Sequence, residues 1–182
     1  IEKFFFDPGK KMIAYTQNTD QEFSVSILDV NANKSKTVFT SNDYGFTDDE
    51  KENIEWSPKI QSIIIPAVKN NEKAYFIIDI EKKEMTNLKD LTGTEKIEKV
   101  RWDKNKIFIF YLSEGDLHYM DIQNPSGNKI IAKEVSSYDL SSDYVYFFRF
   151  SNGIIYRADP EGNEDSQQIT TSAPDNMNDL NY

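Results

Sequence analysis

Few side chains in this sequence could carry out chemistry. The 182 residues include one histidine and no cysteine, which excludes a cysteine nucleophile, a thiolate metal site and a disulfide-bonded scaffold. A Ser-His-Asp site would have to use His118, yet no Gly-x-Ser-x-Gly turn is present to expose a nucleophilic serine. Because His118 lies in the middle of the strand-like segment 116–120, we interpret it as a packing residue.

Two acidic segments are the remaining candidates for a site. Residues 48–52 read Asp-Asp-Glu-Lys-Glu, and we interpret them as a solvated loop, with binding of a cation or a basic partner as the alternative. Residues 159–165 superficially resemble a calcium loop but lack the alternating ligands and the bidentate glutamate of an EF-hand, so we expect a turn. With 31 acidic residues in the chain, two carboxylates that are close in sequence say nothing about glycoside hydrolysis.

No phosphate-binding loop, dinucleotide fingerprint or zinc-ligand spacing occurs. The sequence therefore predicts no catalytic residue, no metal ligand and no cofactor. Its formal net charge of −10 repels phosphate backbones and anionic lipids, so we expect a protein partner rather than nucleic acid. The longest continuous apolar run, residues 107–112, is too short for a transmembrane helix, so no direct membrane insertion is expected.

A pattern that recurs four times predicts the elements that position these residues. Each copy has a large apolar residue, then a polar turn, then a run of residues that favour a β-strand. In the second copy, for example, Trp56 is followed by Ser-Pro-Lys and then by the apolar residues 63–65. The large apolar residues, which we call anchors, are Phe6, Trp56, Trp102 and Leu140.

A second landmark recurs in phase with the anchors. In each copy an aspartate ends a strand-like run and precedes a polar stretch. The side chain of such an aspartate can accept hydrogen bonds from backbone N–H groups two residues further on and so close a turn. We therefore predict a turn-forming role, rather than a ligand role, for Asp29, Asp79, Asp121 and Asp159.

Each repeat reads as four strands in about 40 residues, which is typical of a propeller blade. The first strand ends at the anchor, the third ends at the aspartate, and a short fourth strand closes the unit. No helical period appears, so the predicted fold class is all-β: a β-propeller of four-stranded antiparallel blades with four repeats. The expected blades are 1–40, 52–90, 97–135 and 136–171, with closing strands at 36–39, 84–88, 130–135 and 167–170.

These repeats resemble the TolB-type, WD40-like (PD40) propeller family. Its consensus runs Trp-Ser-Pro-Asp-Gly-Lys, then an apolar strand, then a strand that ends in Asp, then Asp-Gly and a closing Leu-Thr. Residues 56–59 match the first part, residues 158–162 and 168–170 resemble the second, and residues 140–143 depart furthest. The resemblance extends over about residues 1–172. It implies a β-propeller and says little about function, because this fold has many functions.

The resemblance also implies more blades than four, commonly six to eight. Residues 178–182 line up with residues 52–56, the first strand of a unit, so we expect an ordered piece of a longer polypeptide in which residues 172–182 begin a further repeat. The alternative is a complete four-bladed ring, in which they serve as a closing strand. An open arc would leave apolar blade faces in water, at a cost of roughly 25 cal/mol per Å², so self-association is a further expectation.

The predicted function is a non-catalytic protein-interaction or scaffold module. Two alternatives stay open: an accessory propeller domain of a peptidase or hydrolase whose catalytic domain lies elsewhere, and a glycan- or cation-binding propeller. The family resemblance implies an extracytoplasmic or envelope-associated bacterial protein, with the cytoplasm as the alternative.

Overall fold

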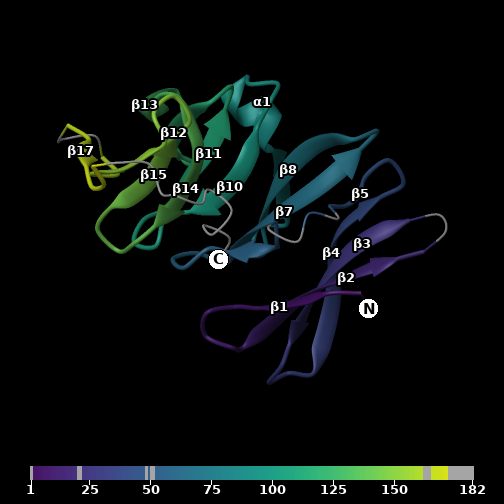
Figure 1. Cartoon of the computed structure of the whole chain (residues 1–182). Coiled ribbons are helices and arrows are strands. Elements are labelled where there is room, and N and C mark those ends of the chain that lie inside the picture. The colour runs from purple at the N-terminus through teal and green to yellow at the C-terminus, as the bar shows by residue number, and fades with distance from the viewer. Residues whose placement is uncertain (1, 20–21, 48, 50–51, 162–164, 172–182) are drawn as a thin grey trace.

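The chain folds as four antiparallel β-sheets that follow one another along the sequence (Figure 1). This computed structural model describes residues 2–19, 22–47, 49, 52–161 and 165–171. In the first, third and fourth sheets, consecutive strands are hydrogen-bonded neighbours. The arrangement confirms the predicted all-β series of blades, which we number 1 to 4 along the chain.

The strands of the blades have the following bounds. Blade 1 contains β1 (Phe4–Phe6), β2 (Met12–Asn18), β3 (Phe23–Asp29) and β4 (Lys34–Ser41). Blade 2 contains β5 (Gly45–Phe46), β6 (Glu55–Trp56), β7 (Ser62–Lys69), β8 (Glu72–Asp79) and β9 (Glu84–Asn87). Blade 3 contains β10 (Glu98–Trp102), β11 (Phe108–Ser113), β12 (Asp116–Asp121) and β13 (Lys129–Ala132). Blade 4 contains β14 (Val135–Leu140), β15 (Val145–Arg149), β16 (Ile154–Ala158) and β17 (Gln167–Gln168).

Blade 2 differs from the others because its first strand is interrupted. Both β5 and β6 pair with β7: Gly45 lies opposite Val68, near the end of β7, and Trp56 lies opposite Ile63, near its start. Residues 47–54 connect these two short strands. The second sheet therefore begins at Gly45, upstream of the expected blade boundary at residue 52, because the isolated pair Gly45-Phe46 carries no strand pattern of its own.

Short irregular segments follow β9 and β13. Helix α1 (Leu88–Thr92) begins where the expected strand 84–88 ends; the side chain of Asn87 accepts a hydrogen bond from the Lys89 N–H, and Gly93 ends the helix at a φ of 68°. Five residues are too few to show a helical period in the sequence. Val135, expected in the closing strand of blade 3, instead begins β14, because Glu134 has a φ of 59° that ends the extended run. Residues Pro125–Gly127 form one 3₁₀ turn before β13.

The predicted turn-forming aspartates are confirmed in all four blades. In blade 1 the Oδ1 atom of Asp29 accepts hydrogen bonds from the N–H groups of residues 31 and 32, and Asp79 does the same for residues 81 and 82. Asp121 and Asp159 each accept one such bond, from residues two positions further on. The repeated aspartates therefore satisfy backbone donors that would otherwise have no partner.

A second set of turn-forming residues was not recognised in the sequence. The residue directly after each anchor accepts hydrogen bonds from backbone N–H groups in the turn before the second strand. In blade 3, Asp103 accepts them from Asn105 and Lys106. The equivalent residues are Asp7, Ser57 and Ser141. Because Asp and Ser both form such turns, this repeat is preserved in chemistry although it varies in residue type.

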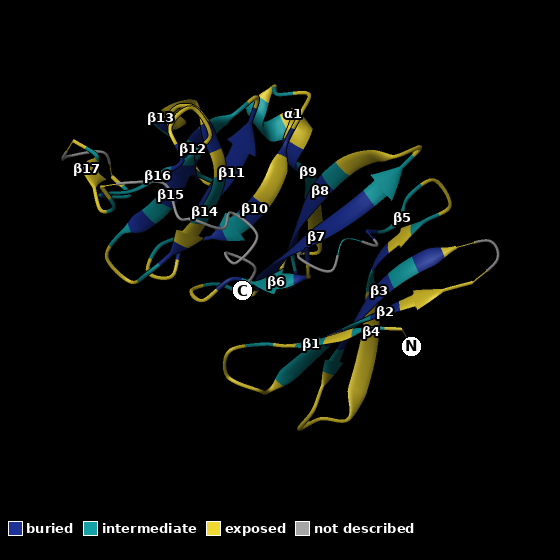
Figure 2. Ribbon diagram, in the orientation of Figure 1, coloured by how far each residue is buried: buried dark blue, intermediate teal, exposed yellow. Residues whose placement is uncertain are grey.

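Three hydrophobic clusters join consecutive blades. The clusters contain mainly alternate residues of the second and third strands, so one face of a blade packs on the blade before it and the other face on the blade after it. For example, Ala14 and Val25 of blade 1 share a cluster with Ile63 and Ile65 of blade 2. Figure 2 shows this as buried segments in the middle of β7 and β11. Burying one such side chain contributes about 1.5–3 kcal/mol, so these contacts supply much of the stability.

The two tryptophan anchors make the same contact between blades. The indole N–H of Trp56 donates a hydrogen bond to the Phe5 carbonyl of blade 1, at 3.0 Å. The indole N–H of Trp102 donates to the Glu55 carbonyl of blade 2, at 3.2 Å. In each case the acceptor is the residue just before the previous anchor, so the repeats are equivalent in three dimensions as well as in sequence.

We expect Trp102→Phe to destabilise the protein by roughly 1–3 kcal/mol, because it leaves the Glu55 carbonyl without this donor at a buried interface. Urea unfolding monitored by circular dichroism would measure the change. Phe150→Leu is a matched control, since Phe150 is exposed and its replacement should change stability by less than about 0.5 kcal/mol. Equal effects of the two substitutions would contradict the role given to the indole.

The turn at Asp79 should make stability depend on pH. The hydrogen bond from the Lys82 N–H, with smaller contributions from the Lys82 side chain, lowers the pKa of Asp79 below its ordinary value of 3.8. Its ionised form therefore stabilises the fold fully above pH 3.8, and this contribution is lost as the pH falls through the lowered pKa.

Asp79→Asn keeps the turn acceptor but removes the charge, so its stability deficit at neutral pH should shrink as the pH falls below 3.8. Asp79→Ala removes the acceptor as well, so we expect its deficit to exceed that of Asp79→Asn by roughly 0.5–1.5 kcal/mol at every pH. Unfolding curves recorded from pH 2 to pH 7 would test both. A deficit of Asp79→Asn that does not vary with pH would refute the assignment.

Candidate functional site

The interruption of the first strand of blade 2 places a carboxylate inside the protein. Glu52, which lies in the segment between β5 and β6, is only 7% exposed. A carboxylate is buried at a high cost unless it is paired and hydrogen-bonded. Glu52 belongs to the acidic segment 48–52 that we interpreted as a solvated loop, and for this residue that interpretation is wrong. Residues 48, 50 and 51 lie outside the described part of the chain.

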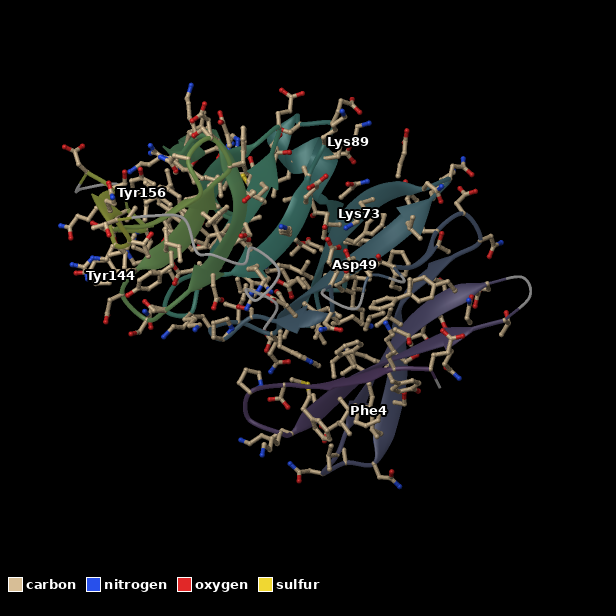
Figure 3. All side chains as sticks on the ribbon, viewed as in Figure 1. Phe4, Asp49, Lys73, Lys89, Tyr144 and Tyr156 are labelled. Atoms are coloured by element: carbon tan, nitrogen blue, oxygen red, sulfur yellow. The ribbon has the colours of Figure 1, made fainter. Side chains whose placement is uncertain are left out.

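Two side chains of strand β8 bind the Glu52 carboxylate. The Tyr75 hydroxyl donates to Oε2 at 2.7 Å, and the Lys73 ammonium group binds Oε1 at 2.7 Å. Lys73 also reaches the Asp49 carboxylate at 3.1 Å, and Figure 3 shows these two side chains close together beside β7 and β8. The pairing compensates for the burial of Glu52.

The protonation of these groups follows from their surroundings. Burial, together with the charge of Glu52, raises the pKa of the Tyr75 hydroxyl, so it remains a donor. Burial alone would lower the pKa of Lys73, but its hydrogen bonds to Glu52 and Asp49 outweigh this and raise that pKa. At neutral pH Lys73 therefore remains an ammonium group and Tyr75 a neutral phenol.

The hydrogen bonds continue from blade 2 into blades 3 and 4. The backbone N–H of Lys99, in β10, donates to the Tyr75 hydroxyl at 3.1 Å. The carbonyl of Lys99 in turn accepts a hydrogen bond from the Tyr138 hydroxyl of β14. Lys99 has a φ of 52° at an irregularity in the pairing of β10 with β11. We call the group Glu52, Lys73, Tyr75, Lys99 and Tyr138 the Glu52 network.

A second polar chain follows the first strands of blades 2 to 4. Glu55 accepts a hydrogen bond from the Trp102 N–H at 3.1 Å and forms an ion pair with Arg101. Arg101 also lies 3.7 Å from the Asp139 carboxylate. These three residues each precede an anchor, and the equivalent residue of blade 1 is Phe5. Burial raises the pKa of Glu55 although the charge of Arg101 opposes this shift.

A groove of about 540 Å³ reaches two members of the Glu52 network, Lys73 and Tyr75. It is lined by Tyr44, by the β7–β8 hairpin (residues 69–75), by Asn87 and Lys89, and by residues 95–98 before β10. Lysine and glutamate side chains both line it, and one pair of them, Lys89 and Glu95, forms an ion pair. We call it the blade 2–3 groove. Its mixed charge suits a ligand that carries both signs or many amide groups.

The other residues singled out in the sequence have structural surroundings. His118 is half-buried in β12, its ring is stacked on that of Tyr111 at 4.7 Å, and burial lowers its pKa. This agrees with the packing role that we predicted. Asp159 forms its turn, while residues 162–164 of the same segment lie outside the described residues. Among the residues that the structure describes, no group of three or more His, Cys, Asp or Glu is placed to hold a metal ion.

No family model matches this sequence, and no curated protein matches it. Solved structures do match. TolB from Acinetobacter baumannii is 15% identical with a TM-score of 0.59, covering 91% of this chain and 42% of its own. An oligogalacturonate lyase in complex with manganese is 10% identical with a TM-score of 0.62, and the match covers 92% of this chain and 52% of the lyase chain. A eukaryotic initiation factor is 14% identical with a TM-score of 0.63, and the match covers 93% of this chain and 43% of the initiation-factor chain.

These similarities show the fold alone: the chain has the architecture of β-propeller blades. It spans about half the length of the solved chains that it matches. Within the described residues, no helix is long and apolar enough to cross a membrane.

The Tyr75 hydroxyl should contribute more to the free energy of unfolding than an ordinary surface hydroxyl, because it both donates a hydrogen bond to a buried carboxylate and accepts one from a backbone N–H. We expect Tyr75→Phe to destabilise the protein by about 1–3 kcal/mol. Tyr15→Phe is the control, since the Tyr15 hydroxyl pairs with Ser35 at an exposed position and should contribute less than about 0.5 kcal/mol. Denaturant unfolding of both variants measures the difference, and a Tyr75→Phe variant as stable as the control would disprove it.

Proposed function

We propose that this chain is a non-catalytic binding module, a β-propeller segment that holds a polypeptide partner in the blade 2–3 groove. The observation that supports this most directly is the groove itself. Its lining includes Lys73 and Tyr75, which both bind the buried Glu52, and the rest of it comes from the β7–β8 hairpin, α1 and the segment before β10. A rigid base with variable loops around it is the usual arrangement of a binding site on a repeat protein.

The chemistry of the groove favours a polypeptide over other ligands. Glu72, Glu95 and Glu98 line it together with Lys69, Lys73, Lys89 and Lys96, so the groove carries both signs of charge, while the net charge of −10 on the chain disfavours a phosphate backbone or an anionic lipid surface. A peptide segment with charges of both signs can pair with both kinds of side chain. Its backbone groups can bond to the amides of Asn70 and Asn71 at the hairpin tip.

A non-catalytic role is supported by the surroundings of the few reactive residues. His118 is stacked on Tyr111, and the buried Glu52 is already bound by a lysine and a tyrosine. Neither residue is arranged as a general base beside a nucleophile. We further propose an extracytoplasmic location, which is supported by the resemblance of the repeats to the TolB type.

Peptides selected by phage display against the immobilised chain would test the proposed site. We expect the selected peptides to shift backbone amide resonances of residues 69–75 and 95–98, and Lys96→Glu to weaken binding roughly three- to tenfold. Lys11→Glu makes the same charge change on an exposed part of blade 1 and should leave the affinity unchanged. Resonance shifts confined to other blades, or equal effects of the two substitutions, would refute the proposed groove.

The proposed site needs no bound divalent cation. A cation that binds the native state raises the melting temperature. Since we expect no such binding, millimolar calcium or manganese should leave the melting temperature of the chain unchanged. Differential scanning fluorimetry with each metal and with a chelator measures this. A rise of several degrees that the chelator reverses would instead favour a cation-binding propeller.

A further inference from the structure

A second groove lies between blades 2 and 3, with a volume of about 480 Å³. It is lined by the turn before β7, the end of β8, strand β9, helix α1 and the turn after β12. The blade 2–3 groove contains Glu72, where β8 begins, whereas this one contains Asp79, where β8 ends. The two ends of such a strand are roughly 23 Å apart, and no described residue lines both grooves. We call this separate site the second groove.

The floor of the second groove is apolar and comes from three segments that are distant in sequence. Ile60 precedes β7, Leu91 belongs to α1, and Ile122 follows β12. Each of the three is half-buried and packs against the hydrophobic cluster that joins blades 2 and 3. The groove therefore offers aliphatic surface that a ligand with an apolar side chain could cover favourably.

Backbone hydrogen bonds hold this floor in place. The N–H group of Ile60 donates to the Ser57 hydroxyl at 3.3 Å, and the Ile60 carbonyl accepts from the Ser62 N–H at 2.8 Å. The N–H group of Ile122 donates to the Ile107 carbonyl at 3.4 Å. Helix α1, which carries the third floor residue, is capped at both ends. Binding would therefore need little ordering of the site itself.

The rim of the second groove is acidic. Glu81 and Glu84 are exposed and line it, and in the described part of the chain neither carboxylate has an ion pair or a hydrogen bond. Asp79 and Lys82, the other charged residues of the lining, pair with each other at 3.2 Å. Lys83 belongs to the same turn but does not line the groove. Two carboxylates thus remain available to a cation beside the apolar floor.

Helix α1 makes this groove particular to the junction of blades 2 and 3 (Figure 1). Within the described residues, blade 2 is the one whose last strand is followed by an α-helix. At the next junction β13 ends at Ala132 and β14 begins at Val135, so there is no room for a helix that could supply an equivalent of Leu91. The groove is therefore a departure from the repeat and not a feature of every pair of blades.

We propose that the second groove binds a polypeptide segment in which a large aliphatic residue is flanked by lysine or arginine. The aliphatic side chain covers the floor, and the stems of the basic side chains lie along it while their charged ends reach Glu81 and Glu84. The exposed amides of Gln61 and Gln123 line the groove and can bond to the peptide groups of the segment. This site is additional to the blade 2–3 groove, whose charges are mixed.

Three short peptides test the two parts of this recognition: acetyl-Lys-Leu-Leu-Lys-amide, acetyl-Glu-Leu-Leu-Glu-amide and acetyl-Lys-Ser-Ser-Lys-amide. We expect the first to shift the methyl resonances of Ile60, Leu91 and Ile122 in an NMR titration. The second should bind at least roughly threefold more weakly because of its charge, and the third should produce no shift at these methyl groups. Methyl resonances that none of the peptides shifts, or equal affinities of the first two, would overturn the proposal.

Reversal of the rim charge should exchange the preference. Glu81→Lys/Glu84→Lys changes two exposed residues, and we expect it to weaken binding of the lysine–leucine peptide roughly tenfold and to strengthen binding of the glutamate–leucine peptide. Glu2→Lys/Glu22→Lys makes the same change at exposed positions of blade 1 and should alter neither affinity. A rim variant that still prefers the lysine–leucine peptide would refute the proposed role of Glu81 and Glu84.

The same titration separates this inference from the proposed function. Lys96→Glu alters the blade 2–3 groove and should leave the methyl shifts of the second groove unchanged, whereas shifts that it abolishes would contradict a separate site. Binding at either groove can therefore fail without the other.

Discussion

Packing of each blade on the one before it is the constraint on which the structure depends. A four-stranded sheet cannot bury both of its faces alone, so its alternate residues must find a neighbour on each side. In blades 2 and 3 the tryptophan anchor fixes this contact by a hydrogen bond from its indole N–H to the preceding blade. Leu140 of blade 4 has no such donor, and the Tyr138 hydroxyl bonds backbone carbonyls of blade 3 instead.

The fold could be predicted because the constraint repeats. The anchors, the closing aspartates and the alternation of apolar residues mark every blade, and each mark reflects a local requirement of turn or packing. The details that could not be predicted are those that lack a periodic mark. The five-residue helix α1 is shorter than two helical turns, and the two-residue strand β5 takes its place only through pairing with the distant Val68 and Ala67.

The candidate site was missed for a related physical reason. Glu52 lies in a run of charged residues, and in sequence such a run is typical of a solvated loop. Its burial depends on Lys73 and Tyr75, which are more than 20 residues away on β8. Glu55 and Arg101 could have been recognised, because each directly precedes a tryptophan anchor and so occupies the same position in consecutive blades.

Departures from the repeat are therefore where distinctive chemistry arises in this molecule. Wherever the pattern is regular, the side chains form turns and contacts between blades. The blades then present similar surfaces. The interruption between β5 and β6 breaks that regularity, and the segment it releases carries a carboxylate into the space between blades 2 and 3. The proposed function therefore places binding specificity in the irregular residues of blade 2, whereas the regular residues determine the shape of the blades.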